Sequence, residues 1–322
     1  MTPGETRGDK NPEKKKNNMS AVSISHIYKT YGKKKEVTAL TDISFEVTKG
    51  ELFGIIGPDG AGKTSLFRIL TTLLLADKGE AKVDGFDVVK DFKAIRKRVG
   101  YMPGKFSLYP DLTVEENLNF FATIFNTTIK ENYDLIKDIY VQIEPFKDRR
   151  AGKLSGGMKQ KLALSCALIH KPSVLFLDEP TTGVDAVSRK EFWGMLKSLK
   201  EQGITILVST PYMDEASMCD RVALLQKGSI MAIDTPKAIV EAFAYDLWAV
   251  KAPAMLPLLK QLHQFDKIIR AYPSGVYHHV VVPKGFSEDI LKEFLAASKI
   301  DGWELHKQQP NIEDCFMSLM TE

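Results

Sequence analysis

The sequence predicts an α/β fold followed by a small α+β domain, on three observations. Several apolar runs are near-continuous, as expected of strands that are covered on both faces. These runs are ELFGIIG (51–57), SVLFLDEP (173–180) and ITILVST (204–210). A glycine-rich turn and a helical stretch follow the first run, and the pattern changes after about residue 240. We therefore expect a main domain over residues 21–240 and an accessory domain over residues 241–322.

Composition bounds the class of protein. The chain has 322 residues, enough for one large domain or two of ordinary size. Its 44% hydrophobic and 26% charged residues are typical of a soluble globular protein. The net charge of +3 is too small to indicate nucleic acid as a partner. No apolar run approaches the roughly 18 residues of a membrane span, and the isolated cysteines predict neither a zinc site nor a disulfide framework.

The first twenty residues differ from the rest. Residues 1–20 are polar throughout, carry several lysines and lack the apolar core of a signal peptide. They predict a disordered basic tail, for which contact with anionic lipid is the alternative to simple solvation. Met19 opens a more protein-like stretch, so it is an alternative start.

The other elements of the main domain follow in chain order. Two stretches that alternate apolar and polar residues predict strands of a half-exposed sheet, at 22–32 and 39–50. A helix is expected from about Lys63 to Leu75, then a strand and turn at 81–88. Residues 113–147 have helical spacing, with Thr113 as N-cap and Glu116 three residues later. A hairpin is expected at 221–234, turning at Lys227 and Gly228.

The accessory domain is expected to have the order β-α-β-β-α-β, with a last helix at 310–320. His278 and His279 lie in one of its expected strands, within VYHHVVV. Adjacent residues of a strand point to opposite faces. This favours two strand histidines without chemistry over a metal site.

The segment GPDGAGKT (57–64) matches the phosphate-binding pattern G-x-x-x-x-G-K-[ST] after a buried strand and before a helix. Its glycines let successive backbone N–H groups point inward to hold phosphates. The loop consists of Gly57, Pro58, Asp59, Gly60, Ala61 and Gly62. Lys63 is expected to reach the β- and γ-phosphates of ATP, Thr64 to bind Mg²⁺ through its hydroxyl, and Ser65 to support a phosphate oxygen.

A second motif is an acidic pair at the end of a strand. VLFLDE places Asp178 at the C-terminal edge of its strand, where open α/β sheets bind ligands. Asp178 is therefore a candidate to hold Mg²⁺, mostly through water. Glu179 would face the attacking water as general base or as the group that positions it.

The segment LSGGMKQKLALSCALIHKPSVLFLDEPTTGVD (154–185) resembles the nucleotide-binding domain of ABC transporters. The resemblance covers about residues 22–240. It implies a P-loop NTPase fold of the RecA-like type, an ABC cassette with an antiparallel β subdomain and a helical subdomain at about 105–155. It also implies that two cassettes pair head to tail around ATP.

The same resemblance assigns further site residues. Ser155, Gly156 and Gly157 of LSGG would close over the nucleotide of a facing cassette, because a helix N-terminus with free amides attracts the γ-phosphate. Tyr31 matches the aromatic residue that stacks on adenine, and a surface aromatic on a sheet edge is the alternative. Asp185 matches the loop that joins the two sites.

Two positions depart from the family pattern. Gly104 stands where the family usually has a glutamine that contacts Mg²⁺ and the attacking water, and Pro211 stands where it has a histidine that touches the γ-phosphate. We expect this site to bind ATP and to hydrolyse it slowly. The intact LSGG then favours a heterodimer with a second ATP-binding cassette that carries both residues. An ordinary active homodimer is the alternative.

The C-terminal unit, ending in PNIEDCFMSLM, resembles the accessory domain of ATPases that pair with ABC-2-type permeases. This implies the ATP-hydrolysing subunit of an exporter, multidrug-exporter-like, held by a separate permease at the cytoplasmic face of the inner membrane. One alternative is a weakened cassette whose chief role is nucleotide-dependent docking. Another is an ABC protein of translation or DNA repair, but this chain shows neither two cassettes nor long heptads.

Overall fold

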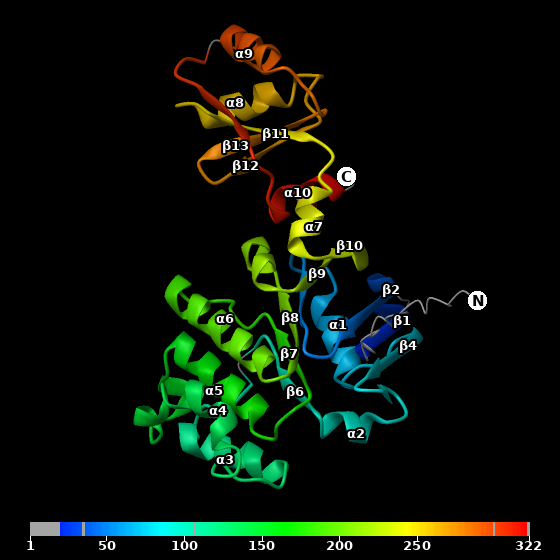
Figure 1. Cartoon of the computed structure of the whole chain (residues 1–322), viewed down its shortest axis with the longest axis vertical. Helices are drawn as coiled ribbons and strands as arrows, with labels where there is room; N and C mark the ends of the chain where they lie inside the picture. Colours follow the sequence, from blue (N-terminus) through cyan, green and yellow to red (C-terminus); the bar gives the residue numbers. More distant parts are fainter. Residues whose placement is uncertain (1–19, 34–35, 106, 299, 321–322) are drawn as a thin grey trace, which may run out of the picture.

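The fold is described from a computed structural model that covers residues 20–33, 36–105, 107–298 and 300–320. Figure 1 shows a larger body that contains most of the chain and a smaller body formed by its C-terminal part, with two short helices between them. The tail predicted for residues 1–20 lies outside the described residues, apart from Ser20. No helix in the described ranges is long and apolar enough to cross a membrane.

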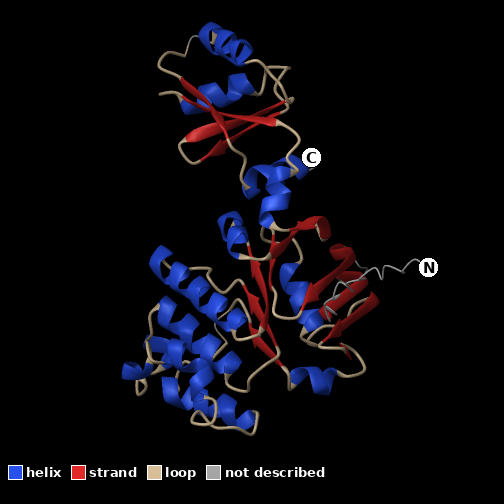
Figure 2. Cartoon of the chain, in the orientation of Figure 1, coloured by secondary structure: helices blue, strands red, loops and turns tan. Residues whose placement is uncertain are grey.

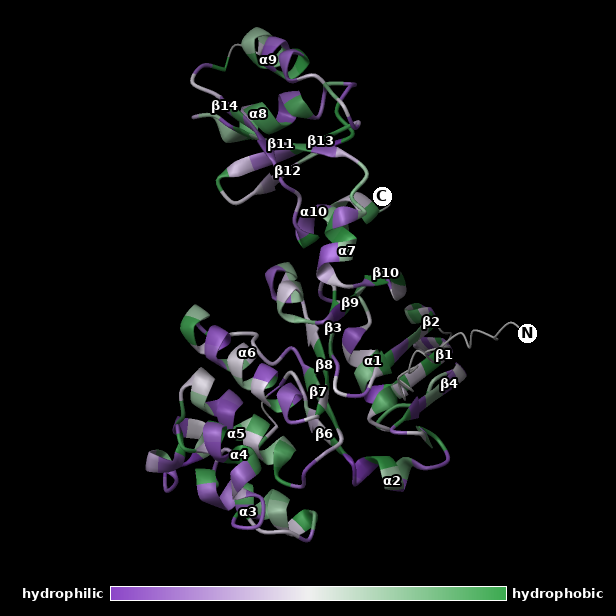
Figure 3. Cartoon of the chain, in the orientation of Figure 1, coloured by the Kyte–Doolittle hydropathy of each residue, from purple (hydrophilic) through white to green (hydrophobic). Residues whose placement is uncertain are grey.

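The centre of the larger body is a six-stranded sheet with the order β10-β9-β3-β8-β7-β6. Its strands are β3 (Leu52–Ile56), β6 (Val99–Met102), β7 (Val174–Asp178), β8 (Thr205–Thr210), β9 (Arg221–Gln226) and β10 (Ser229–Asp234). All are parallel except β10, which forms the predicted hairpin with β9. Every residue of β3, β7 and β8 is buried, as their apolar sequences predict. Figure 3 shows the hydrophobic colouring of β7 and β8.

An antiparallel sheet with the order β2-β1-β4-β5 lies beside the central one (Figure 2). Its strands are β1 (Ser20–Tyr31), β2 (Val37–Thr48), β4 (Lys78–Val83) and β5 (Phe86–Asp87). Apolar residues of this sheet, of α1 and of one face of the central sheet form one continuous core. Strand β3 contributes Phe53 and Ile55 to this core and Leu52 and Ile56 to the core on the other face, so it is covered on both sides.

Helices surround the central sheet, and α3 to α6 gather on one side of it (Figure 1). The helices are α1 (Lys63–Leu70), α2 (Phe92–Arg96), α3 (Val114–Ile124), α4 (Tyr133–Tyr140), α5 (Gly156–Leu168), α6 (Ala186–Glu201) and α7 (Pro236–Glu241). The 3₁₀ turns are η1 (Glu144–Phe146), η2 (Ala151–Lys153) and η3 (Met213–Met218). Thr113 and Glu116 form the predicted capping box at the start of α3.

Two helical predictions differ from the structure in length. The helix expected from Lys63 to Leu75 ends at Leu70. Thr72 adopts a positive φ of 64°, and the next two amides bond back to the carbonyl of Arg68, which closes the helix. The stretch 113–147, expected to be helical, contains two separate helices. Asn126, with φ 53°, follows α3 and begins the loop that leads to α4.

The smaller body has the predicted order of elements. These are β11 (Asp246–Lys251), α8 (Met255–Leu262), β12 (Arg270–Ser274), β13 (Tyr277–Val282), α9 (Glu288–Ala297) and β14 (Glu304–Gln308). The strands form an antiparallel sheet with the order β12-β13-β11-β14, and α8 and α9 pack on one of its faces. The last helix, α10 (Ile312–Leu319), follows this unit.

The two strand histidines have ordinary partners. A ring nitrogen of His278 contacts the carbonyl oxygen of Met255 at 2.8 Å, and Nδ1 of His279 contacts Oδ1 of Asp314 at 2.6 Å. Within the described ranges, no group of three or more histidine, cysteine, aspartate or glutamate residues is placed to hold a metal ion. These contacts favour the interpretation that both histidines are structural residues of the strand.

The last helix returns to the larger body. Ile312, Cys315 and Phe316 of α10 belong to the core that contains α3 to α6 and the second face of the central sheet. Their neighbour Asp314 turns the other way and accepts hydrogen bonds from the C-terminal sheet, including one from the Tyr272 hydroxyl at 2.7 Å. By packing, α10 therefore joins the two bodies, whereas the sequence placed it wholly in the accessory domain.

Candidate nucleotide-binding site

The loop between β3 and α1 approaches neighbouring backbone so closely that glycine is required. A Cβ atom at Gly57 would lie 2.1 Å from the carbonyl oxygen of Leu225. At Gly62, where φ is +108°, it would lie 2.3 Å from the carbonyl oxygen of Ala39. These contacts fix the loop against β9 and β2, so its curled shape is set by the fold.

Several amides of this loop and of the start of α1 are free. In the described part of the chain, the N–H groups of Gly60, Gly62, Lys63 and Thr64 donate to no protein acceptor, and no side chain caps α1. Amides at the N-terminal end of a helix carry partial positive charge that attracts anions. A cradle of free donors on an eight-residue helix fits a phosphate group.

Lys63 is a buried cation at the same place, with 3% of its surface exposed. Its Nζ donates to the carbonyl oxygens of Gly57 at 2.7 Å and Pro58 at 3.0 Å. It also forms an ion pair with Oε1 of Glu179 at 3.1 Å. A buried ammonium group needs such partners, and the arrangement brings the lysine of the loop and the glutamate of the acidic motif together.

The acidic pair lies at the end of β7, and Asp178 is 3% exposed. Oδ1 of Asp178 accepts a hydrogen bond of 2.6 Å from the hydroxyl of Ser209 on β8. Glu179 has a positive φ of 51°, a conformation uncommon outside glycine. Its N–H donates to the carbonyl oxygen of Ser209 at 3.0 Å and to its Oγ at 3.1 Å. This turn aims the carboxylate of Glu179 at Lys63.

The oxygen donors fit Mg²⁺. Among the residues that the structure describes, the hydroxyl of Thr64 and Oδ2 of Asp178 make no hydrogen bond to protein. Hydroxyl and carboxylate oxygens are the hard ligands that Mg²⁺ takes, usually together with water. Thr64 and Asp178 could therefore hold the ion. Asp178 is nearly buried and accepts one hydrogen bond, so a bound cation would stabilise its charge.

Tyr31 lies at the rim of the loop and is 38% exposed. Its hydroxyl is 3.0 Å from Oγ of Ser65, the second residue after the loop lysine. The ammonium group of Lys29 lies 5.7 Å from its ring centroid. The side chain is thus an exposed aromatic ring beside the phosphate cradle, which suits a stacking contact with a base.

The LSGG residues lie elsewhere on the larger body. Ser155 is the N-cap of α5, where its Oγ accepts from the N–H of Met158 at 3.4 Å. A Cβ atom at Gly157 would come within 2.8 Å of Oγ of Ser188 on α6, so this glycine lets α5 start close to α6. Ser155 and Gly156 are exposed, and no interaction within the described residues joins LSGG to the phosphate loop.

Asp185 has a local function that the sequence did not predict. It is the N-cap of α6, and its Oδ1 accepts from the N–H groups of Val187 at 3.1 Å and Ser188 at 3.0 Å. Hydrogen bonds from Ser188 hold the pKa of this carboxyl below its usual value. Its side chain is exposed at the start of α6.

Both departures from the family pattern border the acidic pair or the loop. A Cβ atom at Gly104 would lie 3.0 Å from the carbonyl oxygen of Asp178 and 3.8 Å from Cβ of Glu179. Pro211 directly follows Thr210, whose carbonyl oxygen accepts from the N–H of Gly57 at 3.2 Å. The positions are therefore those from which a glutamine and a histidine would reach the site, but neither residue has a polar side chain.

Two polar residues near the site were not predicted. Ser209, already described, is one. The other is Glu215 on η3, 2% exposed, which accepts hydrogen bonds from Thr181 at 2.8 Å and Thr210 at 2.5 Å and lies 3.7 Å from Nε of Arg189. It joins the loop after Glu179 to the end of β8. A hydroxyl or carboxylate inside an apolar pattern is the signal that could have found them, but only the strand register shows what each contacts.

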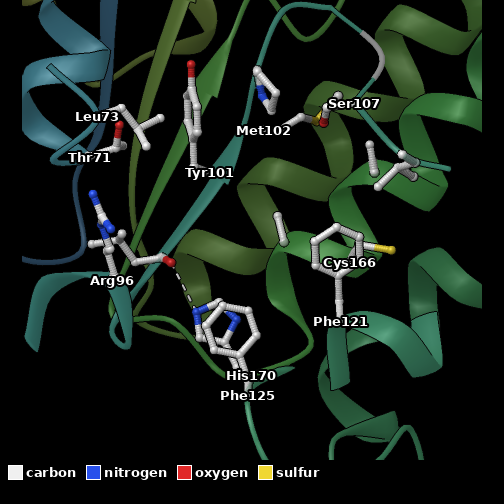
Figure 4. A pocket seen from close by; sticks show the side chains of 15 residues that line it. Thr71, Leu73, Arg96, Tyr101, Met102, Ser107, Phe121, Phe125, Cys166 and His170 are labelled. Carbon is white, nitrogen blue, oxygen red and sulfur yellow. Dashed lines mark hydrogen bonds between the residues drawn. The ribbon is translucent and has the colours of Figure 1, made fainter. Parts of the chain in front are cut away.

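A separate cavity of about 330 Å³ lies between the edge strand β6 and helices α3 and α5 (Figure 4). Its lining is mostly apolar and contains no residue of the phosphate loop. It includes Tyr101, Met102, Phe121, Phe125, Ala163 and His170. Burial and the charge of Asp178 raise the pKa of Tyr101 to about 12, so this phenol stays neutral near pH 7.

A family model and several known proteins that match this chain all point to one family. Residues 40–182 match the family model described as ABC transporter. The chain is 36% identical over 309 residues to the probable multidrug ABC transporter ATP-binding protein YbhF of Escherichia coli, which covers 94% of this chain and 52% of that protein. The chain thus spans about half the length of that curated relative. It is also 36% identical to the Nod factor export ATP-binding protein I of Burkholderia lata, over 94% of this chain and 97% of that protein.

A further relative is the doxorubicin resistance ATP-binding protein DrrA of Mycobacterium tuberculosis, 32% identical over 95% of this chain and 96% of that protein. Among solved structures, cbiO1 from Clostridium perfringens, part of the ABC transporter complex cbiONQ, matches with a TM-score of 0.62 and 25% identity, over 69% of this chain and 91% of that one. The cassette MJ0796, in a dimeric post-hydrolysis state bound to ADP and Pi, matches with a TM-score of 0.60 and 26% identity, over 66% and 98% of the two chains.

Proposed function

Since the chain belongs to the ABC transporter family of ATP-binding proteins, we propose that it is the ATP-binding and ATP-hydrolysing subunit of an exporter whose permease is a separate chain. The observation that carries the proposal is the pairing of Lys63 with Glu179 at 3.1 Å, next to free amides of the loop and of the start of α1. The names of three relatives, which refer to multidrug transport, Nod factor export and doxorubicin resistance, support export as the process.

The proposed roles follow the geometry of the site. The loop from Gly57 to Gly62 binds the phosphates of ATP through its amides, and Ser65 adds a hydroxyl. Lys63 neutralises phosphate charge, Thr64 and Asp178 hold Mg²⁺, and Tyr31 stacks on adenine. ATP supplies the phosphoanhydride bond and Mg²⁺ neutralises the charge that develops when water cleaves it. Glu179 orients that water and takes its proton.

The exposed residues serve a second cassette in this proposal. Ser155, Gly156 and Gly157 lie at the N-terminal end of a 13-residue helix. Because two of these residues are glycines, a phosphate can approach the backbone amides closely. Asp185, exposed at the start of α6, lies on the loop that would meet the facing site. The dimeric state of the matched MJ0796 structure supports this pairing.

We propose that hydrolysis at the site built on this chain is slow, and that the partner cassette is a different chain with a faster site. The support is the chemistry of positions 104 and 211, which border the acidic pair and the loop without a polar side chain. Each missing contact to the reacting phosphate would cost on the order of 10²-fold in rate, although such losses do not simply add.

The substitution Pro211→His tests this cause directly. An imidazole at this position would add a donor facing the γ-phosphate, and we expect cleavage of ATP on this chain's site to accelerate by about tenfold or more. Rapid-quench measurement of phosphate release from the native complex checks it. Pro211→Ala is the control, since it removes the proline ring and restores the N–H without adding an imidazole. Equal rates in the two variants would show that the missing side chain is not what slows this site.

We further propose that the cavity between β6, α3 and α5 receives a segment of the permease. The cavity is mostly apolar, and its wall includes Tyr101 and Met102 of β6, the strand that pairs with β7, at whose end Asp178 lies. A peptide segment bound there would therefore contact the strand that pairs with the one carrying Asp178. The subunit would then be peripheral, at the cytoplasmic face of the membrane that holds the permease.

Ala163→Arg tests the docking proposal, because Ala163 lines the cavity on α5. A long cation would fill the space, and we expect recovery of the permease with the purified complex to fall by about 90% while ATP binding by the chain is unchanged; a loss of about 1.4 kcal/mol is tenfold in affinity. Ala296→Arg, on the exposed surface of α9, is the matched control. Equal permease recovery in both variants would exclude this cavity as the docking place.

Co-purification of the complex from native membranes and identification of its subunits tests the function as a whole. A permease with several apolar spans and a second ATP-binding cassette are expected. A weakened cassette that mainly docks is the second candidate function, and the same absence of polar groups at Gly104 and Pro211 favours it. Transport that persists when this chain's site cannot hydrolyse ATP would distinguish the two.

A further inference from the structure

We propose that Ser209 is a positioning residue for the proposed ATPase reaction, holding Asp178 in the orientation that binds Mg²⁺ and fixing the turn at Glu179. The proposal rests on the proposed function. It names a residue that lies outside the phosphate-binding and acidic motifs and that the family pattern does not assign.

The register of the central sheet places Ser209 beside the acidic pair. In the parallel pairing of β7 with β8, Asp178 and Ser209 are direct partners, and on the other side of β8 Ser209 is the partner of Ile55 on β3. Its hydroxyl is fully buried and donates to Oδ1 of Asp178 at 2.6 Å. This is the short distance expected of a hydroxyl that donates to an ionised carboxylate.

Asp178 depends on that donor. In the portion of the chain that the structure describes, Ser209 is the one group that donates a hydrogen bond to the Asp178 carboxylate. With Oδ1 held by Ser209, the carboxylate is fixed and Oδ2 is left for the ion. Without the donor, the carboxylate could rotate, and a nearly buried charge would lose its partner. Groups that orient metal ligands in this way typically change metal affinity when they are removed.

The same residue fixes the glutamate. The N–H of Glu179 donates both to the carbonyl oxygen of Ser209 and to its Oγ, at 3.0 and 3.1 Å. These bonds hold Glu179 in its left-handed conformation, from which its carboxylate reaches Lys63. A non-glycine residue in this conformation needs surrounding contacts to stay there. Ser209 therefore bonds to both members of the acidic pair.

The end of β8 is itself tied to the phosphate loop. The carbonyl oxygen of Thr210 accepts from the N–H of Gly57, the first residue of the loop. Ser209 is therefore fixed relative to the phosphates as well as to Asp178. Since neither Gly104 nor Pro211 has a polar side chain, we assign to Ser209 part of the positioning that polar side chains at those positions would supply.

The test measures metal binding rather than turnover. The chain is mixed with a non-hydrolysable ATP analogue, with protein in excess so that all nucleotide is bound, and free Mn²⁺ is followed by electron paramagnetic resonance as it is titrated. For Ser209→Ala we expect the dissociation constant for Mn²⁺ to rise about tenfold, as for other residues that orient metal ligands. Affinity for the analogue in EDTA should stay within about twofold, because the loop amides that bind phosphate are untouched.

Three further variants make the result specific. Ser209→Cys keeps the size of the side chain with a weak donor and should resemble Ser209→Ala, and it carries the test if the alanine variant does not fold. Ser209→Thr keeps the hydroxyl and should retain Mn²⁺ affinity within about threefold of the wild type. Thr205→Val removes another buried hydroxyl of β8, one that accepts from the N–H of Gly50 at 3.0 Å, and should leave Mn²⁺ affinity unchanged.

The outcomes separate this proposal from the proposed function. If the wild type binds the analogue and Mn²⁺, and Ser209→Ala and Ser209→Cys bind Mn²⁺ equally well, Ser209 is a packing residue and the proposal is wrong. An equal loss in Thr205→Val would assign the effect to general weakening of β8 and would also overturn it. A wild-type chain that binds neither nucleotide nor metal would overturn the proposed function and this inference with it.

Discussion

Replacing Lys63 by methionine is expected to weaken ATP binding by about 100-fold, which corresponds to about 2.7 kcal/mol. The ammonium group of Lys63 is 3% exposed and lies among loop carbonyls and the carboxylate of Glu179. Methionine keeps the unbranched stem, so packing is retained while the charge is lost. The site then lacks its buried cation, and Glu179 faces the phosphates unpaired, which adds repulsion to the lost attraction. Equilibrium binding of ATP to the purified chain measures the effect.

Lys237→Met is the matched control for this loss. Its side chain is 84% exposed on α7, where it forms an ion pair with Glu241 at 3.6 Å. Such a surface pair contributes little, so the control removes the same charge from the chain while ATP affinity should stay within about twofold. If both variants bound ATP as the wild type does, the loop between β3 and α1 would not be the nucleotide site.

Glu179→Gln is expected to act unequally in the two cassettes of the native complex. In this chain, whose site we propose to be slow, steady-state ATP turnover should fall by less than about threefold. The same substitution at the corresponding glutamate of the partner cassette should reduce turnover by about 10² to 10⁴, the range for removal of a general base. The ion pair with Lys63 is lost in this chain's variant, so ATP binding here should be equal or tighter.

Turnover and transport by the two single variants, assayed in the same membranes, give the comparison. Equal and severe losses would indicate two working sites of similar speed, and would contradict the heterodimer with one slow site. A complex that contains two copies of this chain would contradict it too. Severe loss of transport only in the partner's variant agrees with the proposal.

Much of the fold could be predicted because local chemistry and burial agree. The hairpin of β9 and β10 was predicted at Lys227 and Gly228, and both residues have positive φ, as a two-residue hairpin turn requires. The capping box of α3 was predicted from Thr113 and Glu116 alone. The place of α10 could not be predicted. An amphipathic pattern shows that a helix buries one face, but Ile312 and Phe316 do not reveal which body they pack against.

The candidate site divides in the same way. The phosphate loop and Asp178 were found because their spacing follows from what a triphosphate and Mg²⁺ need. Ser209 was not found, since a serine at the end of an apolar strand is ordinary until the register of β7 and β8 places it beside Asp178. Asp185 was assigned to the facing site, and the structure adds its bonds to the first turn of α6. Contacts set by strand pairing are not visible in a single sequence.

We propose that this chain holds ATP firmly and cleaves it slowly. The most direct test loads the native complex with labelled ATP, one molecule per cassette, and follows cleavage in a single turnover by rapid quench. We expect about half of the bound ATP to be cleaved quickly and the rest to stay intact for about 100 times longer. Cleavage of all bound ATP in one fast phase would contradict it, because two sites of equal speed leave no role for the missing side chains at Gly104 and Pro211.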